Sequence, residues 1–210
     1  MNIAKIAALC KQRKRISLYD KGEGSRDQWI SAGLGYYRLT GMPYVEPASC
    51  FTLFDIPEDK QEKFFTEHES LPLDVGFEEY CRFDSEIYPA DLHIKWKGTG
   101  YVPFATGAGM QFVQDSCFTP LGDIKEPRFF LRKAAGKSNY IAVKDGLFLC
   151  ALLKPAEIID FPLISALNNM ACSCEYVLEH IPDKEEDEQL SIDDVAELKV
   201  NKSTGEVIEE

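Results

Sequence analysis

The stretch YIAVKDGLFLCALLKP, residues 140–155, decides what fold is expected. Two apolar runs flank Lys-Asp-Gly (144–146), and Asp-Gly adopts the left-handed backbone of a tight turn, so the stretch predicts an antiparallel strand pair. WISAGLGYYRL (29–39) is similar, because it also begins with an aromatic residue and Ile and has a glycine six positions on. Glycine accepts positive φ, so two strands are expected to meet near Gly33 and Gly35.

Further features recur in the same order in both parts of the chain. A strand is expected to begin at Arg15 and another at Arg128, each ahead of one hairpin. LFDIP (53–57) and IIDFP (158–162) share two apolar residues, Asp, one apolar residue and Pro at an expected strand-to-helix junction. Each match alone is weak, because hairpins and proline-started helices with an Asp cap are common. Together they favour an internal duplication.

The expected fold class is α+β, with two related lobes of antiparallel sheet and short helices, followed by a disordered acidic tail. The first lobe is expected at 1–105, the second, shorter lobe at 106–182 and the tail at 183–210. The expected helices cover 3–13, 55–69, 110–118 and 160–171. The expected strands cover 15–20, 28–33, 35–41, 50–56, 76–84, 91–98, 101–105, 127–133, 156–160 and 172–180, besides the pair in 140–155.

Charge is distributed unevenly along the chain. The formal net charge is −12, and residues 181–210 hold eleven acids and three bases. The first fifteen residues hold no acid and five bases, which are Lys5, Lys11, Arg13, Lys14 and Arg15. One interpretation is a solvated helix face and a solubilising tail. The other is a DNA-binding cluster, because neutralising phosphates requires such a group of cations.

Neither a membrane span nor a secretory signal is expected. No apolar run approaches the roughly 18 residues of a membrane helix, and in MNIAKIAALCKQRKR (1–15) the basic cluster follows the short apolar stretch instead of preceding it. A cytoplasmic location is therefore expected. The seven cysteines mostly lie in apolar runs and are interpreted as small buried hydrophobes of a reducing compartment.

The sequence contains no convincing catalytic or metal-binding pattern. The hydrolase motif G-x-S-x-G and the nucleotide-binding motif G-x-x-x-x-G-K-[ST] are both absent. Asp91 lies near Lys95, as an acid and a lysine do in a nuclease metal site. Such a site has one residue between the acid and the lysine, and the spacing here differs. Cys172 and Cys174 form C-x-C near His180 without a second ligand pair, and we expect both on one face of a strand. The expectation is a protein that is not an enzyme and needs no cofactor or metal.

In layout, the chain resembles the DNA sliding-clamp (processivity-factor) family of the two-domain phage type. CFTLFDIPEDKQEKFF (50–65) is similar to the clamp pattern of a strand leading into an inner helix, and 140–155 resembles the strand pair that closes a clamp domain. The resemblance covers most of residues 1–180. It implies sheets outside and helices around duplex DNA, in a trimeric ring. It also implies a non-catalytic accessory protein of DNA replication or recombination, encoded by a phage or mobile element.

The resemblance further implies a protein partner, such as a polymerase or another replication or host protein. A different class of function stays open: an acidic interaction or inhibitor protein that mimics nucleic acid and binds a basic protein partner. A folded acidic face within 70–91 would favour mimicry, whereas charge concentrated in the tail would weaken it. The acids of that face are Asp74, Glu78, Glu79, Asp84, Glu86 and Asp91.

Overall fold

The computed structural model describes residues 2–22, 25, 27–107, 109–134, 139–158 and 161–179. The chain divides into a compact unit, Met1–Ile158, and a second unit, Ile159–Glu210, of which one helix is described. The predicted acidic tail at 183–210 lies outside the described residues.

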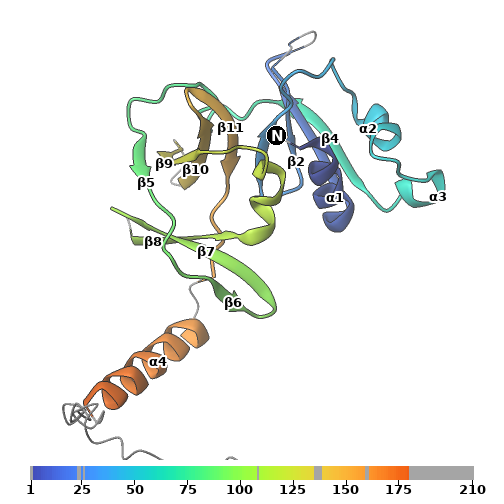
Figure 1. Ribbon diagram of the computed structural model, residues 1–210. Helices are drawn as coiled ribbons and strands as arrows, with labels where there is room; N and C mark the ends of the chain where they lie inside the picture. Colours follow the sequence, from blue (N-terminus) through green and yellow to red (C-terminus); the bar gives the residue numbers. More distant parts are fainter. Residues whose placement is uncertain are drawn as a thin grey trace, which may run out of the picture. The chain divides into compact units, whose positions relative to one another are not determined.

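The compact unit is mixed α+β, as expected, and strands dominate it (Figure 1). Its strands are β1 (Arg15–Asp20), β2 (Trp29–Ser31), β3 (Gly35–Arg38), β4 (Phe65–Ser70), β5 (Ser85–Ile87), β6 (Ile94–Trp96), β7 (Thr99–Thr106), β8 (Gly109–Gln114), β9 (Pro127–Lys133), β10 (Asn139–Asp145) and β11 (Phe148–Leu153). Its helices are α1 (Ile3–Arg13), α2 (Pro47–Leu53) and α3 (Glu58–Gln61), with 3₁₀ turns η1 (Asp115–Cys117) and η2 (Thr119–Leu121). The second unit contributes α4 (Phe161–Glu179).

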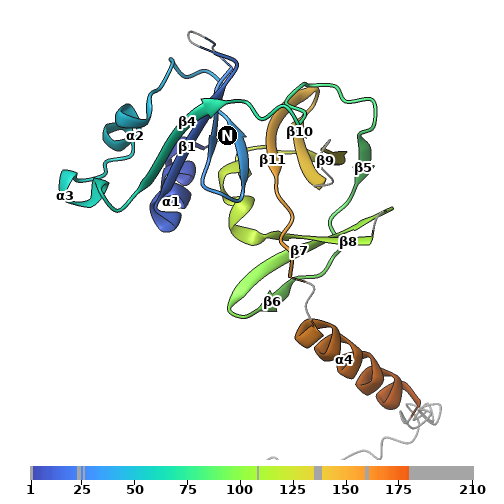
Figure 2. The ribbon, with the colours of Figure 1, turned by 180° about the vertical axis from the view of Figure 1, so that it is seen from behind.

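Two three-stranded meanders meet at the centre of the large sheet. The strand order is β4-β1-β2-β3-β11-β10-β9-β5, and β6, β7 and β8 form a separate small sheet. β1, β2 and β3 follow one another antiparallel, as do β9, β10 and β11, and β3 pairs antiparallel with β11 (Figures 1 and 2). The large sheet therefore crosses the expected boundary between residues 105 and 106, which does not separate two sheets.

The two hairpin motifs present their first two residues to the sheet in the same way. Trp29 and Tyr140 are buried in one apolar cluster, and Ile30 and Ile141 are buried in the other. Successive side chains of a strand point to opposite faces, so each aromatic–Ile pair places its aromatic ring on one face and its Ile on the other. The internal duplication itself stays a prediction.

The glycine that the two motifs share has a different role in each. Gly146 has a φ of 58° in the turn between β10 and β11, where the left-handed backbone favours glycine. Gly35 instead pairs with Leu153 across β3 and β11. A Cβ atom on Gly35 would lie 2.6 Å from the carbonyl oxygen of Leu152, so the missing side chain lets these two strands approach each other.

The large sheet carries an apolar cluster on each face. The larger cluster joins strand residues such as Ile16 to Ile6 of α1, Cys50 of α2 and Phe104 of the small sheet. Both helices and the small sheet thus cover the same face. The opposite cluster is smaller and includes Phe77, from the segment that precedes β5.

α1 forms where the sequence predicts it. The side chain of Asn2 accepts a hydrogen bond from the backbone N–H of Lys5 at 3.2 Å and so caps the first turn. Ile6 and Cys10 are buried at helical spacing. Lys14, with a φ of 52°, ends the helix, and its N–H donates to the carbonyl oxygen of Cys10.

Three cysteines behave as the buried hydrophobes expected of them. Cys10, Cys50 and Cys117 are each 1% exposed or less. Burial raises the pKa of each of these thiols to about 12, and Cys50 adds to the shift at Cys10. These groups therefore stay protonated and unreactive while the fold is closed.

The stretch after β3 differs from the expected strand at 50–56 and helix at 55–69. Pro47, at the first helical position, starts α2, which extends to Leu53. The expected second helix is reduced to α3, and the chain then pairs with β1 as the parallel strand β4. Pairing with a distant strand overrides the local helical pattern of the sequence.

Three other expectations are wrong, one of them entirely and two in part. The expected strand at 76–84 has no strand within it, and β5 follows it. The expected helix at 110–118 is β8 followed by η1, because β7 pairs with this segment as far as Gln114. The expected strand at 156–160 has one isolated bridge at Ala156, and residues 159–160 lie outside the described part of the chain.

α4 continues through 172–179, where a strand was expected at 172–180, and His180 lies outside the described residues. No glycine or proline occurs between Pro162 and Pro182, so nothing in the sequence ends the helix early. Cys172 and Cys174 are exposed on this helix, where residues two apart do not face each other. Among the described residues, no helix has the length and apolar character needed to cross a membrane.

Gly35→Ala tests the close approach of β3 and β11. The added methyl group would meet backbone atoms of β11, so the free energy of unfolding is expected to fall by about 1–3 kcal/mol, a typical effect of overpacking. Chemical denaturation measures the change. Gly107→Ala is the control, because a Cβ atom there meets nothing within 4 Å. Equal stability of the two variants would contradict this role of Gly35.

Candidate anion-binding site

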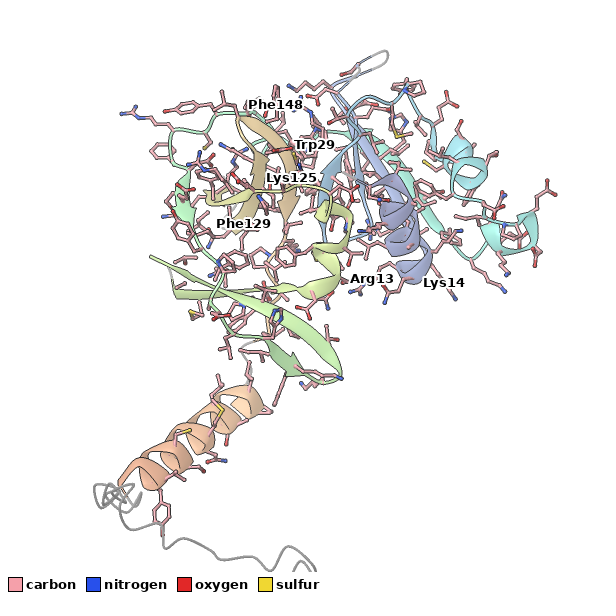
Figure 3. The ribbon with its side chains drawn as sticks, in the orientation of Figure 1. Arg13, Lys14, Trp29, Lys125, Phe129 and Phe148 are labelled. Atoms are coloured by element: carbon pink, nitrogen blue, oxygen red, sulfur yellow. The ribbon has the colours of Figure 1, made fainter. Side chains whose placement is uncertain are left out.

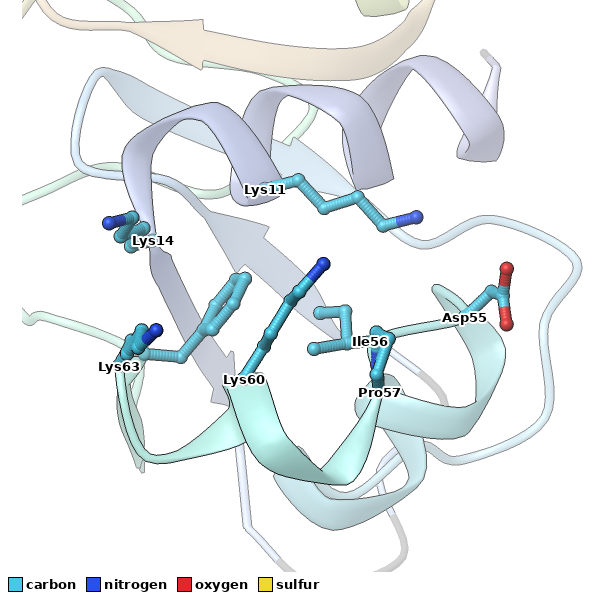
Figure 4. Close-up of a pocket in the computed structure, with 8 residues that line it drawn as sticks. Lys11, Lys14, Asp55, Ile56, Pro57, Lys60 and Lys63 are labelled. Carbon is cyan, nitrogen blue, oxygen red and sulfur yellow. The ribbon is translucent and has the colours of Figure 1, made fainter.

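A pocket of about 540 Å³ opens between the end of α1 and the segment that contains α3 (Figure 4). We call it the lysine pocket. It is lined by Lys11, Lys14, Asp55, Ile56, Pro57, Lys60, Lys63 and Phe64. Figure 4 shows Lys11 and Lys14 on the α1 side and Lys60 and Lys63 on the opposite side. Two elements that are distant in sequence thus contribute four lysines to the lining of one pocket.

One backbone hydrogen bond joins the two walls of the lysine pocket, and two further hydrogen bonds shape the wall that contains α3. The N–H of Phe65 donates to the carbonyl oxygen of Lys14 at 2.9 Å, which joins the start of β4 to the end of α1. The N–H of Ile56 donates to the carbonyl oxygen of Phe51 at 2.8 Å, after Asp55 reverses the chain with a φ of 50°. The side-chain amide of Gln61 donates to the carbonyl oxygen of Ile56 at 3.1 Å.

The four lysines leave positive charge at this place. All four are exposed, and none forms an ion pair with a carboxylate of the described residues. Asp55 is the only acidic residue among those that line the pocket. In a chain with a net charge of −12, such a local excess of cations attracts anions.

The five candidate DNA-binding residues do not act as one group. Lys11 and Lys14 line the lysine pocket. Arg13, beside Lys14 at the end of α1, donates instead to the side-chain oxygen of Gln114 (Figure 3). Lys5 lies on the first turn of α1 and points toward Gly122, where an added Cβ atom would lie 3.1 Å from its Nζ.

Arg15 is engaged within the fold. Its Nη2 donates to Oε1 of Glu67 at 2.9 Å, and its guanidinium lies 4.6 Å from the ring centroid of Phe65. Glu67 is partly buried; this burial opposes its ionisation, but hydrogen bonds from Tyr19, Ser17 and Arg15 lower the pKa of its carboxyl. Arg15 therefore holds β4 against β1 and lies outside the lysine pocket.

Lys60 and Lys63 were not among the sequence candidates. They lie in PEDKQEKFF (57–65), where the neighbouring acids made the charge look mixed. The spacing of three residues between them was the available signal, because side chains three apart share one face of a helical turn. Their proximity to α1 depends on the pairing of β4 with β1, which no local pattern shows.

A histidine and a buried carboxylate meet at the far end of β1. Nε2 of His68 is 2.7 Å from Oδ2 of Asp20, and the hydroxyl of Tyr44 donates to the same oxygen at 3.2 Å. Burial opposes ionisation of Asp20, but hydrogen bonds from His68 and the N–H of Gly22 hold its pKa below the usual value. In the described part of the chain, no serine or cysteine is paired with this imidazole, so the arrangement lacks a nucleophile.

A second charged group, the buried Asp84–Arg132–Lys144 cluster, fixes the segment before β5 to the sheet. Arg132 donates to both carboxylate oxygens of Asp84, at 2.9 and 2.7 Å, and Lys144 donates to one of them at 2.9 Å. Arg132 also donates to the carbonyl oxygens of Gly76 and Glu78. Burial opposes ionisation of Asp84, but the hydrogen bonds from Arg132 and Lys144 lower the pKa of its carboxyl.

Arginines neutralise half of the acids on the expected acidic face. Asp84 pairs with Arg132, Glu79 accepts from Arg38, and Glu86 accepts from Arg128 at 2.8 Å. The negative surface in 70–91 is therefore weaker than its six carboxylates suggest.

Comparison of the chain with protein-family models, with curated proteins and with solved structures finds no match. The described residues contain no group of three or more His, Cys, Asp or Glu side chains that could hold a metal ion.

Asp84→Asn tests the buried cluster. The change leaves Arg132 and Lys144 without their carboxylate, and removing one partner of a buried ion pair costs about 3–5 kcal/mol of stability. Thermal or chemical denaturation measures the loss. Glu86→Gln, which removes the exposed partner of Arg128, is the control and is expected to have little effect. Equal effects of the two changes would contradict the structural role of the cluster.

The same carboxylate predicts a dependence of stability on pH. The pKa of Asp84 is lower in the folded chain than its ordinary value of 3.8. The pairing therefore stabilises the fold above about pH 4 and is lost as the pH falls through the lowered pKa. Unfolding curves between pH 7 and pH 3 are expected to show a steeper acid loss for the unmodified protein than for Asp84→Asn. If both proteins lost stability equally as the pH fell, the loss would come from other carboxylates.

Proposed function

We propose that this chain is a non-catalytic, clamp-like accessory protein of DNA replication or recombination, which contacts the phosphates of duplex DNA through the lysine pocket. The observation that carries the proposal is the set of four ammonium groups around one pocket of an otherwise acidic chain. The overall field of an acidic protein repels DNA, so a concentrated group of cations is what allows contact with phosphates.

Helix stability is the simpler explanation of basic residues near the end of α1. Cations in the last turn interact favourably with the helix dipole, and Lys11 and Arg13 lie there. The same explanation covers Lys60 in the last turn of the four-residue helix α3, but it does not extend to Lys63, which follows α3 and lines the same pocket. Anion binding accounts for all four lysines.

The clamp-like part of the proposal draws on the arrangement of the layers. In a clamp the helices face DNA and the sheets lie outside, and here α1 and α2 both cover one face of the large sheet. The alternative of a nucleic-acid mimic is less well supported, because Glu79, Asp84 and Glu86 are paired with arginines.

The salt dependence of DNA binding tests the role of the lysine pocket. Lys60→Gln combined with Lys63→Gln is expected to weaken duplex binding and to reduce the slope of log K against log salt by about 2, because two phosphate contacts are lost. Fluorescence anisotropy with a labelled duplex between 50 and 200 mM salt measures both quantities.

The matched control is Lys125→Gln combined with Lys133→Gln, which removes the same charge. Lys125 lies on the segment before β9, away from the end of α1 (Figure 3). Equal losses in the two double variants would show a response to net charge alone and would contradict binding at the pocket. Absence of duplex binding at 50 mM salt would overturn the proposed function.

The solution mass tests the ring. A clamp-like trimer is expected to have about three times the chain mass of 23.7 kDa at micromolar concentration. Sedimentation or light scattering measures it. A strict monomer would remove the ring from the proposal.

A further inference from the structure

We infer that the lysine pocket accepts one unpaired nucleotide, with the phosphate on the lysines and the base or sugar on the apolar floor. The inference rests on the proposed contact with nucleic acid and specifies the form in which the ligand enters. It predicts that single strands, and duplexes with an unpaired end, bind at this site better than fully paired duplexes.

The size of the lysine pocket favours a ligand larger than a simple anion. Its volume of about 540 Å³ lies within the roughly 300–1,000 Å³ usual for small-molecule sites. Inorganic phosphate would fill a small part of this space. The backbone of a paired duplex would lie across the opening, because its bases are stacked inside the helix and cannot enter.

The chemistry of the lining matches the two parts of a nucleotide. The lysines form a cationic rim, whereas Ile56, Pro57 and Phe64 are apolar. The ring of Phe64 packs edge-on against Phe51, with centroids 6.0 Å apart, so its position is fixed by packing. Bases bind by stacking on such aromatic side chains, and nearby cations follow the backbone. A bare anion would gain nothing from this floor.

The polar groups of the lysine pocket also differ between its ends. Figure 4 shows Lys14 and Lys63 at one end and Asp55 at the other, with Ile56 between them. Lys60 lies near the middle, and the side chain of Lys11 extends toward the Asp55 side, so cations for a phosphate line the pocket along its length. The carboxylate of Asp55 accepts hydrogen bonds, and the amino groups of cytosine, adenine and guanine donate them. The pocket therefore offers both cations for a phosphate and an acceptor for a base.

Competition binding with the full chain tests the inference. A labelled 12-nucleotide oligo-dC is bound to the chain at 50 mM salt. Unlabelled duplex of equal length, dCMP and inorganic pyrophosphate are then compared as competitors. We expect oligo-dC to bind at least tenfold more tightly than the duplex, and dCMP to compete better than pyrophosphate. Lys60→Gln with Lys63→Gln is expected to weaken oligo-dC binding about tenfold, and the control pair at Lys125 and Lys133 much less.

Phe64→Leu separates stacking from charge. It removes the aromatic face and keeps the charge, so affinity for oligo-dC is expected to fall about tenfold while duplex affinity stays unchanged. Unchanged duplex affinity and an unchanged melting temperature show that the variant is folded, and Phe64→Tyr is expected to retain binding. The matched control is Phe148→Leu, because Phe148 is an aromatic residue outside the pocket and is 70% exposed.

The outcomes distinguish the inference from the proposed function. Binding of duplex through Lys60 and Lys63, with no preference for oligo-dC and no effect of Phe64→Leu, would overturn the inference and leave the proposed function standing. Pyrophosphate competing as well as dCMP would reduce the pocket to a simple anion site and would also overturn it. Binding of neither duplex nor oligo-dC would overturn both.

Discussion

The close approach of β3 and β11 is the constraint on which the rest of the compact unit depends. These strands come from opposite ends of that unit, and Gly35 allows their backbones to meet where a side chain would collide with Leu152. The pairing joins two meanders into one sheet with two apolar faces. Once the sheet is continuous, α1, α2 and the small sheet can cover one face, and the segment held by Arg132 can cover part of the other.

Four arginines and the four lysines of the pocket have different tasks in this chain, although Lys144 shares the structural role of the arginines. Arg15, Arg38, Arg128 and Arg132 each pair with a carboxylate and tie one segment to another. The planar guanidinium suits such fixed, directional contacts. The lysines of the pocket are exposed point charges, which suit an anion that arrives from solution. The proposed site therefore uses the cations that the fold itself does not need.

Local sequence signals were sufficient where the structure is itself local. α1 has its cap and its apolar spacing, and the Asp-Gly turn fixes the hairpin of β10 and β11. They were insufficient where a distant partner decides the conformation. β4 was expected to be the end of a helix but gains backbone hydrogen bonds from β1, and β8 was expected to be a helix but gains them from β7. The same limit applies to the site: Lys11 and Lys14 were visible as a cluster, whereas Lys60 and Lys63 join them only through the path of β4.

The buried thiols of Cys10 and Cys50 lie in the shared core of α1 and α2, the helices next to the lysine pocket. A thiol buried in that core reacts with an alkylating reagent only during moments when the surrounding core opens. The rates of alkylation at Cys10 and Cys50, read apart from those of the exposed Cys172 and Cys174, would therefore record how often this part of the molecule opens. α1 and the segment after α2 form the walls of the pocket. A ligand that holds these walls together would therefore lower the rate of alkylation.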